Sequence, residues 1–133
     1  MIRIPLSALA VACALLPVSA SAKPPLGDVP AIRDGLIDVA IAYEISEVCP
    51  SIKARLLAGI GRLNGLKQTA RSMGYSRSEV DAFIDNDAEK DRLEALARAK
   101  LARLGAARGD VDAHCRVGRS EMSRQSAIGT LLR

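Results

Sequence analysis

The stretch Glu47-Val-Cys-Pro-Ser-Ile52 (EVCPSI) places a cysteine directly before a proline. A proline disfavours helical backbone in the residue that precedes it, so a helix that enters this stretch has to end near Cys49. Proline is also well suited to the first turn of a helix, where its missing N–H is not needed, so we expect Pro50 to open a second helix. The stretch therefore predicts a boundary between two helices.

The N-terminus has the pattern of an export signal. One arginine is followed by an apolar run over residues 4–18, which is too short to span a bilayer comfortably, and then by the small residues Ser19-Ala20-Ser21-Ala22. This pattern predicts a signal peptide that is removed by cleavage between Ala22 and Lys23, with cleavage after Ala20 as the alternative. An N-terminal buried helix or a membrane anchor is a weaker alternative. A lipid on Cys13 is also weaker, because the usual leucine is missing three residues before that cysteine.

The predicted division of the chain has three parts. Residues 1–22 form the signal peptide, residues 23–30 form an extended lead-in rich in proline, and residues 31–133 form a single domain. Cleavage removes one base and no acid, so the net charge falls from +4 for the full chain to +3. Aromatic residues make up only 2% of the chain, and an exported address also argues against nucleic acid as a partner. We therefore expect a periplasmic or secreted protein that does not stay inserted in a membrane.

Two cysteines, Cys49 and Cys115, remain outside the signal. An even number of cysteines in an exported chain favours a disulfide, and in the chain-entropy model a bridge over this separation stabilises a fold by about 4 kcal/mol. A redox pair is a weaker alternative because the sequence contains no Cys-x-x-Cys motif. A nucleophilic Cys115 activated by His114 is also weak, because neighbours on a helix point about 100° apart.

The hydrophobic periodicity predicts an all-α bundle of about four helices with no sheet. We expect the final segment, residues 126–133, to dock on the core. Ser76-Arg-Ser-Glu79 matches a capping box, and a break near residues 85–88 is an open alternative for the helix that follows it. The predicted helices cover residues 31–49, 51–73, 76–104 and 110–124.

The helix predicted over residues 51–73 combines large and small residues on opposite sides. Its aliphatic stripe runs from Ile52 to Met73, and Gly61 and Gly65 belong to a cluster of small residues roughly opposite. Each glycine costs about 1 kcal/mol of helix propensity, which close packing would explain. We therefore expect this helix to be central and packed from both sides.

Charge is arranged in two blocks. Residues 50–77 carry six bases and no acid, and residues 78–94 carry seven acids against two bases. The simplest interpretation is that the two blocks face each other across a helical hairpin. The alternative is that one block forms a surface for a partner of opposite charge.

The sequence contains no set of residues that predicts a catalytic, cofactor or metal site. Asp85-Asn-Asp-Ala-Glu89 resembles the start of a calcium loop, but lysine and leucine stand at the sixth and twelfth positions, where glycine and glutamate are needed. Asp110 and His114 could share a helical face, but nothing completes a metal site or an acid–base pair. We interpret His114, the only histidine, as a structural residue.

Several short motifs, taken together, resemble a small secreted family of unknown function from Rhodobacter-like alphaproteobacteria. The resemblance covers nearly all of the expected mature chain and implies a single secreted helical domain with two cysteines. It implies no activity and no functional residues. The motifs are Lys23-Pro-Pro-Leu26, Asp34-Gly-Leu36, Cys49-Pro50, Gly74-Tyr-Ser76, Asp87-Ala-Glu-Lys90, Cys115 with Gly118, and Ile128-Gly129 before Leu131-Leu-Arg133.

We therefore expect a non-enzymatic envelope protein that acts through protein contacts. A stress-related or chaperone-like role is one alternative, because separated charge blocks can release or bind clients when carboxylates become protonated. An enzyme or small-ligand binder with a site assembled from distant residues is the other. The sequence does not indicate the oligomeric state.

Overall fold

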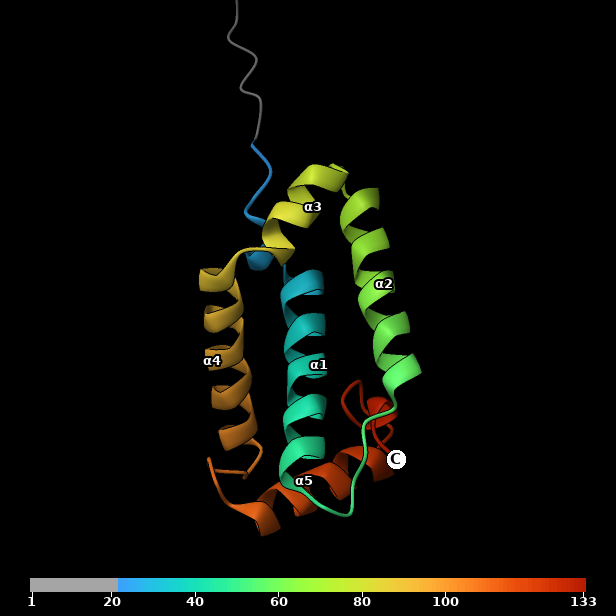
Figure 1. Ribbon diagram of the computed structural model, residues 1–133, viewed down its shortest axis with the longest axis vertical. Helices are drawn as coiled ribbons and strands as arrows, with labels where there is room; N and C mark the ends of the chain where they lie inside the picture. The colour runs from blue at the N-terminus through green and yellow to red at the C-terminus, as the bar shows by residue number, and fades with distance from the viewer. Residues whose placement is uncertain (1–21) are drawn as a thin grey trace, which may run out of the picture.

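The structure is a computed structural model that describes residues 22–133. Helix α1 (Pro30–Val48) runs through the middle, α2 (Leu56–Ser72) and α4 (Asp87–Arg103) lie on its two sides, α3 (Arg77–Ile84) covers one end and α5 (Val111–Ser123) crosses the other (Figure 1). Two 3-10 turns, η1 (Leu26–Asp28) and η2 (Gly129–Leu131), complete the described part. The all-α prediction is confirmed for residues 22–133, which form five α-helices instead of about four.

The fifth helix arises from a break in the segment predicted over residues 76–104. Ser76 and Glu79 form the predicted capping box at the start of α3, which ends at Ile84. The side chain of Asn86 then accepts a hydrogen bond of 3.1 Å from the backbone N–H of Glu89, which starts α4. Because the Asn86 side chain pairs with an N–H that has no partner within the new helix, α4 can begin directly after the turn.

Helix α1 is the central helix of the domain. It contacts α2, α4, α5 and both 3-10 turns, and its buried residues point to several sides. Ile41 and Ile45 are fully buried in the larger hydrophobic cluster, and Ile32 belongs to a smaller cluster near η1 and α3.

The prediction that the second helix is central was wrong. Only Ala70 of α2 is buried, and a Cβ added at Gly61 or Gly65 would meet nothing within 4 Å. The aliphatic stripe does contact α1 through Leu66, which lies against Gly35. The two glycines on the other side have no neighbour within that distance, so close packing does not explain them.

The prediction that Pro50 opens a helix was also wrong. Pro50 and Ser51 form a turn, and the next residues are extended until α2 begins at Leu56. Lys53 and Arg133 exchange two backbone hydrogen bonds of 2.8 Å, and the N–H of Arg55 donates to the carbonyl of Leu131. These bonds keep the chain out of helix, because the same backbone groups pair with the C-terminal segment.

The C-terminal segment docks on the core, as predicted. Ile128, Leu131 and Leu132 are buried, and Ala54 and Leu132 form an isolated antiparallel bridge. No strand forms in residues 22–133 beyond this bridge.

The predicted disulfide is present between Cys49 and Cys115, with 5.2 Å between the two Cα atoms. Cys49 follows the last residue of α1, and Cys115 lies in α5. The bridge therefore fastens the crossing helix to the end of the central helix.

The predicted signal peptide lies almost wholly outside the described residues. Cleavage between Ala22 and Lys23, and the division of the chain at residues 22 and 30, therefore stay predictions. Within residues 22–133, no helix is long and apolar enough to cross a membrane.

Candidate functional site

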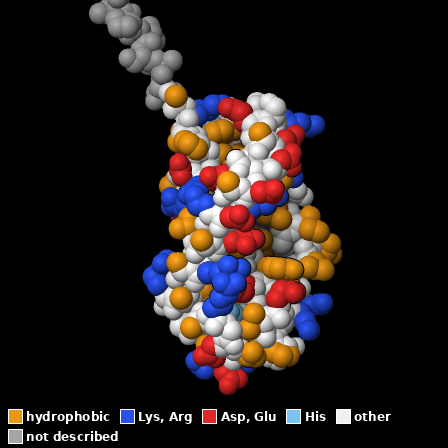
Figure 2. Space-filling model, turned by 60° about the vertical axis from the view of Figure 1, so that its left-hand side comes forward, with side chains coloured by type: hydrophobic (Ala, Val, Ile, Leu, Met, Phe, Trp, Pro, Cys, Tyr) orange, Lys and Arg blue, Asp and Glu red, His pale blue; other side chains and the backbone are white. Residues whose placement is uncertain are grey.

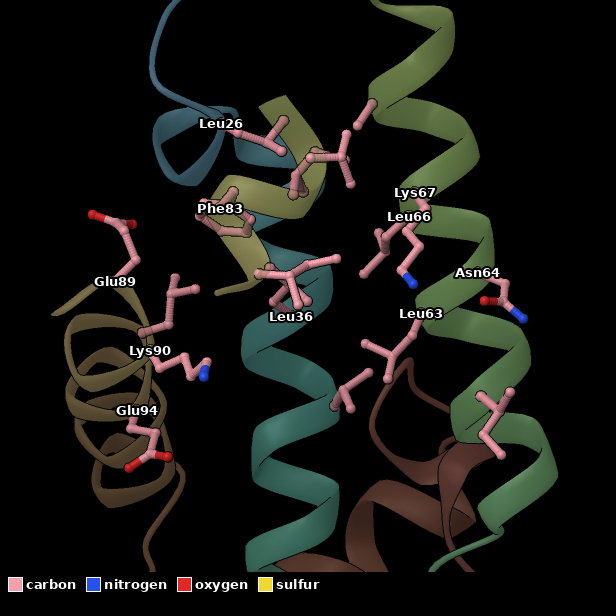
Figure 3. Close-up of a pocket in the computed structure, with 17 residues that line it drawn as sticks. Leu26, Leu36, Leu63, Asn64, Leu66, Lys67, Phe83, Glu89, Lys90 and Glu94 are labelled. Atoms are coloured by element: carbon pink, nitrogen blue, oxygen red, sulfur yellow. The ribbon is translucent and has the colours of Figure 1, made fainter. Parts of the chain in front are cut away.

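An apolar groove lies over one face of α1, between α2 and α4. Its volume is about 700 Å³, and α3 and η1 close its upper end. Figure 3 shows Leu36 on the floor, Leu63 and Leu66 on the α2 wall and Phe83 above. The groove is a large hollow with a mainly apolar lining, which makes it the candidate binding site.

The floor of the groove has the spacing of a helix-packing seam. Ile32, Leu36 and Val39 line the groove, and Tyr43 follows one turn later on the same face with 59% of its surface exposed. The intervals of four, three and four residues match the a and d positions of a heptad. Four residues at these intervals extend over about 16 Å of helix, the length of three turns.

The α2 wall continues beyond the groove as an exposed apolar surface. Ile60 and Leu63 line the groove and are 55% and 37% exposed, and Leu56, one turn before Ile60, is 71% exposed. Leu57 is 85% exposed on the outer side of the helix. Figure 2 brings the α4 side of the molecule forward. Charged side chains lie over that side, and hydrophobic side chains gather at the right-hand edge of the view. Exposed apolar surface of this kind marks an interaction site.

The predicted cysteine and histidine residues form a structural cluster at the other end of α1. Cys115 is held in the disulfide and has no free thiol. The ring of His114 is fully buried, and its Nδ1 donates a hydrogen bond of 2.6 Å to the carbonyl of Asp110. Its Nε2 lies 3.7 Å from a carboxylate oxygen of Glu44 and has no hydrogen-bond partner. The cluster offers no nucleophile beside a base.

The acidic stretch that resembles a calcium loop has a structural use. Asn86 caps α4, and Asp87 pairs with Lys90 at 3.0 Å one turn along the same helix. Across residues 22–133 there is no group of three or more His, Cys, Asp or Glu side chains placed to hold a metal ion.

The expectation that the two charge blocks face each other across a hairpin was wrong for the acids on α4. Helices α2 and α4 lie on opposite sides of α1 (Figure 1). None of the six bases in residues 50–77 forms an ion pair in the described part of the chain. Asp87, Glu89 and Glu94 of α4 pair instead with bases on α4 itself, as Glu89 does with Arg92 at 2.9 Å.

The residues that line the groove were not identified as a site from the sequence. They come from five separate elements, so no local spacing joins them. One feature of the sequence did point to the groove. The apolar face of the first helix is too wide to be covered by a single neighbouring helix, and Tyr43 continues that face. A face of this width predicts a second covering surface, and the structure leaves that surface open.

The fold and the groove define a small all-helical domain, closed by one disulfide and open on one face. A family model described as a family of unknown function (DUF5333) matches residues 24–133, so the chain belongs to that family. Neither a curated protein nor a solved structure matches the chain.

Proposed function

We propose that the protein is an exported, non-enzymatic protein that acts through protein contacts and binds an apolar helix of a partner in the groove on α1. The observation that carries the proposal is the apolar floor of Leu36 and Val39, which is partly exposed between two helical walls and continues from the buried Ile32. A partner helix laid in the groove would pack against α1, α2 and α4, and the four helices together would resemble a four-helix bundle.

The shape of the groove favours a helix over a small molecule. A pocket for a small molecule encloses most of its ligand, whereas this groove is open along one side and its apolar surface continues to Leu56. Burial of the exposed apolar side chains by a partner would supply the binding energy, at about 25 cal/mol for each Å² removed from water.

The export part of the proposal rests on the N-terminal pattern and on the disulfide. Structural disulfides persist mainly in oxidising compartments, and the bridge between Cys49 and Cys115 is part of the core.

Site-specific photo-crosslinking in the organism that makes the protein tests the proposal. A photoreactive phenylalanine at Leu63 lies in the groove, and the same residue at Leu96, which is equally exposed, lies outside it as a matched control. We expect an adduct at Leu63 whose cross-linked peptide has apolar residues at intervals of three and four, and its loss on Ile60→Glu. Equal adducts at both positions would contradict the proposal.

A further inference from the structure

The charges around the groove are not balanced, and the imbalance bears on the occupant. Lys67 lines the α2 side of the groove and forms no ion pair with any described residue. Arg71 follows one turn later on α2, beyond the residues that line the groove, and is also without an ion pair in residues 22–133. The block of residues 50–77 contains no acid that could neutralise either base.

The α4 side of the groove is neutralised by its own helix. Lys90 donates a hydrogen bond of 3.0 Å to Asp87, and this bond raises the pKa of Lys90. The lysine is therefore charged and already paired with Asp87. Glu94 lies 4.0 Å from Arg98. Figure 3 shows Lys90 and Glu94 on the α4 wall, across the groove from Lys67. Among the charged residues that line the groove, Lys67 alone forms no ion pair in residues 22–133.

We infer that the helix bound in the groove is flanked by carboxylate side chains along the edge that lies against α2. This inference rests on the proposed function and names the chemistry of its partner. A helix seated on α1 would cover part of Lys67 and remove water from it, so an unpaired ammonium there opposes binding. A carboxylate opposite Lys67 would restore the lost interaction.

Two synthetic helical peptides test this inference. Each is about 18 residues long, enough for an alanine-rich sequence to hold helix, and carries leucine at heptad a and d positions. One has glutamate and the other lysine along one edge of the stripe, and the remaining positions are identical. Binding of each labelled peptide to the full mature protein is measured by fluorescence anisotropy at low salt and at high salt.

We expect the glutamate peptide to bind about three-fold more tightly at low salt, the size of effect that one exposed ion pair produces, and the difference to shrink at high salt. Lys67→Glu should reverse the preference. Arg62→Glu is the matched control, because Arg62 is also an unpaired base of α2 but does not line the groove, and it should leave the preference unchanged.

Equal binding of both peptides overturns the inference and leaves the groove as a helix site. Binding of neither peptide overturns the proposed function itself. Sedimentation of the protein alone tests whether a second copy of the chain fills the groove. A dimer that forms with rising concentration and is lost on Ile60→Glu would show that it does, and would overturn the inference.

Discussion

The ammonium group of Lys23 lies 2.9 Å from the carboxylate of Glu79. The same ammonium donates to the carbonyl of Gly74 at 2.7 Å, and the hydroxyl of Tyr75 donates to the carbonyl of Pro24 at 2.6 Å. The lead-in is therefore fastened to the turn between α2 and α3. Lys23 is also the residue at which we expect the mature chain to begin, so the predicted cleavage leaves this fastening intact.

Replacement of Glu79 by glutamine is predicted to destabilise the protein at neutral pH and not in acid. The pKa of Glu79 is lowered from its ordinary value of 4.5, first by the N–H of Ser76 and then by Lys23. A carboxylate with a lowered pKa contributes stability that is fully present above about pH 4.5. This stability is lost as the pH falls through the lower pKa of the folded state. Urea unfolding at a series of pH values measures the difference between the two proteins.

Asp81→Asn is the control for this experiment, because Asp81 is exposed on the same helix and forms no ion pair in the described residues. A loss of stability on Glu79→Gln that is the same at low and at neutral pH would show that the carboxylate charge is not the cause.

Two helical glycines are predicted to respond to alanine with opposite signs. A Cβ at Gly118 of α5 would lie 2.5 Å from Cδ1 of Ile52 and 2.8 Å from Cγ2 of Ile45, whereas at Gly61 of α2 it would meet nothing within 4 Å. We expect Gly118→Ala to lower the free energy of unfolding by about 1–2 kcal/mol, because the added methyl group would overpack the core. Gly61→Ala should raise it by up to about 1 kcal/mol through helix propensity. Denaturant unfolding of both variants checks the signs, and a stabilised Gly118→Ala would contradict the packing described.

The contrast between these glycines shows what the sequence could predict and what it could not. The end of the first helix near Cys49, the capping box at Ser76, the disulfide and the docked tail were predicted from the sequence, and all four are present. The neighbours of α2 do not follow from local chemistry, because a helix with apolar residues on one side and glycines on the other looks the same whether or not another helix covers it.

The charge blocks were misjudged for a related reason. A short turn between two helices brings their ends together, but the break at Asn86 separates the acidic segment into α3 and α4 and sends α4 to the far side of α1. The groove is a consequence of the same path, since α2 and α4 become its two walls. Its residues could be recognised only after the path of the chain was known.

Reduction of the disulfide is predicted to lower the free energy of unfolding by about 2–5 kcal/mol, a large part of the stability of a small domain. The bond joins α1 to α5, which otherwise meet through a modest set of core side chains that includes Ile45 and Val117. Chemical denaturation with and without a reductant measures the loss. The double variant Cys49→Ser with Cys115→Ser should unfold at the same midpoint in both conditions, and a reductant effect on it would show that another process is responsible.

The intact mass of the exported protein is predicted to equal that of residues 23–133 less two hydrogens. Signal peptidase should cut between Ala22 and Lys23, and oxidation of Cys49 and Cys115 removes one hydrogen from each thiol. Mass spectrometry after alkylation, with and without prior reduction, measures both features, and two alkyl groups should be gained only after reduction. A retained Met1 would contradict export by this signal, an added acyl chain would place a lipid anchor on Cys13, and alkylation without reduction would show that the thiols are free in the cell. Because cleavage and oxidation change the mass independently, one measurement tests the compartment and the disulfide separately.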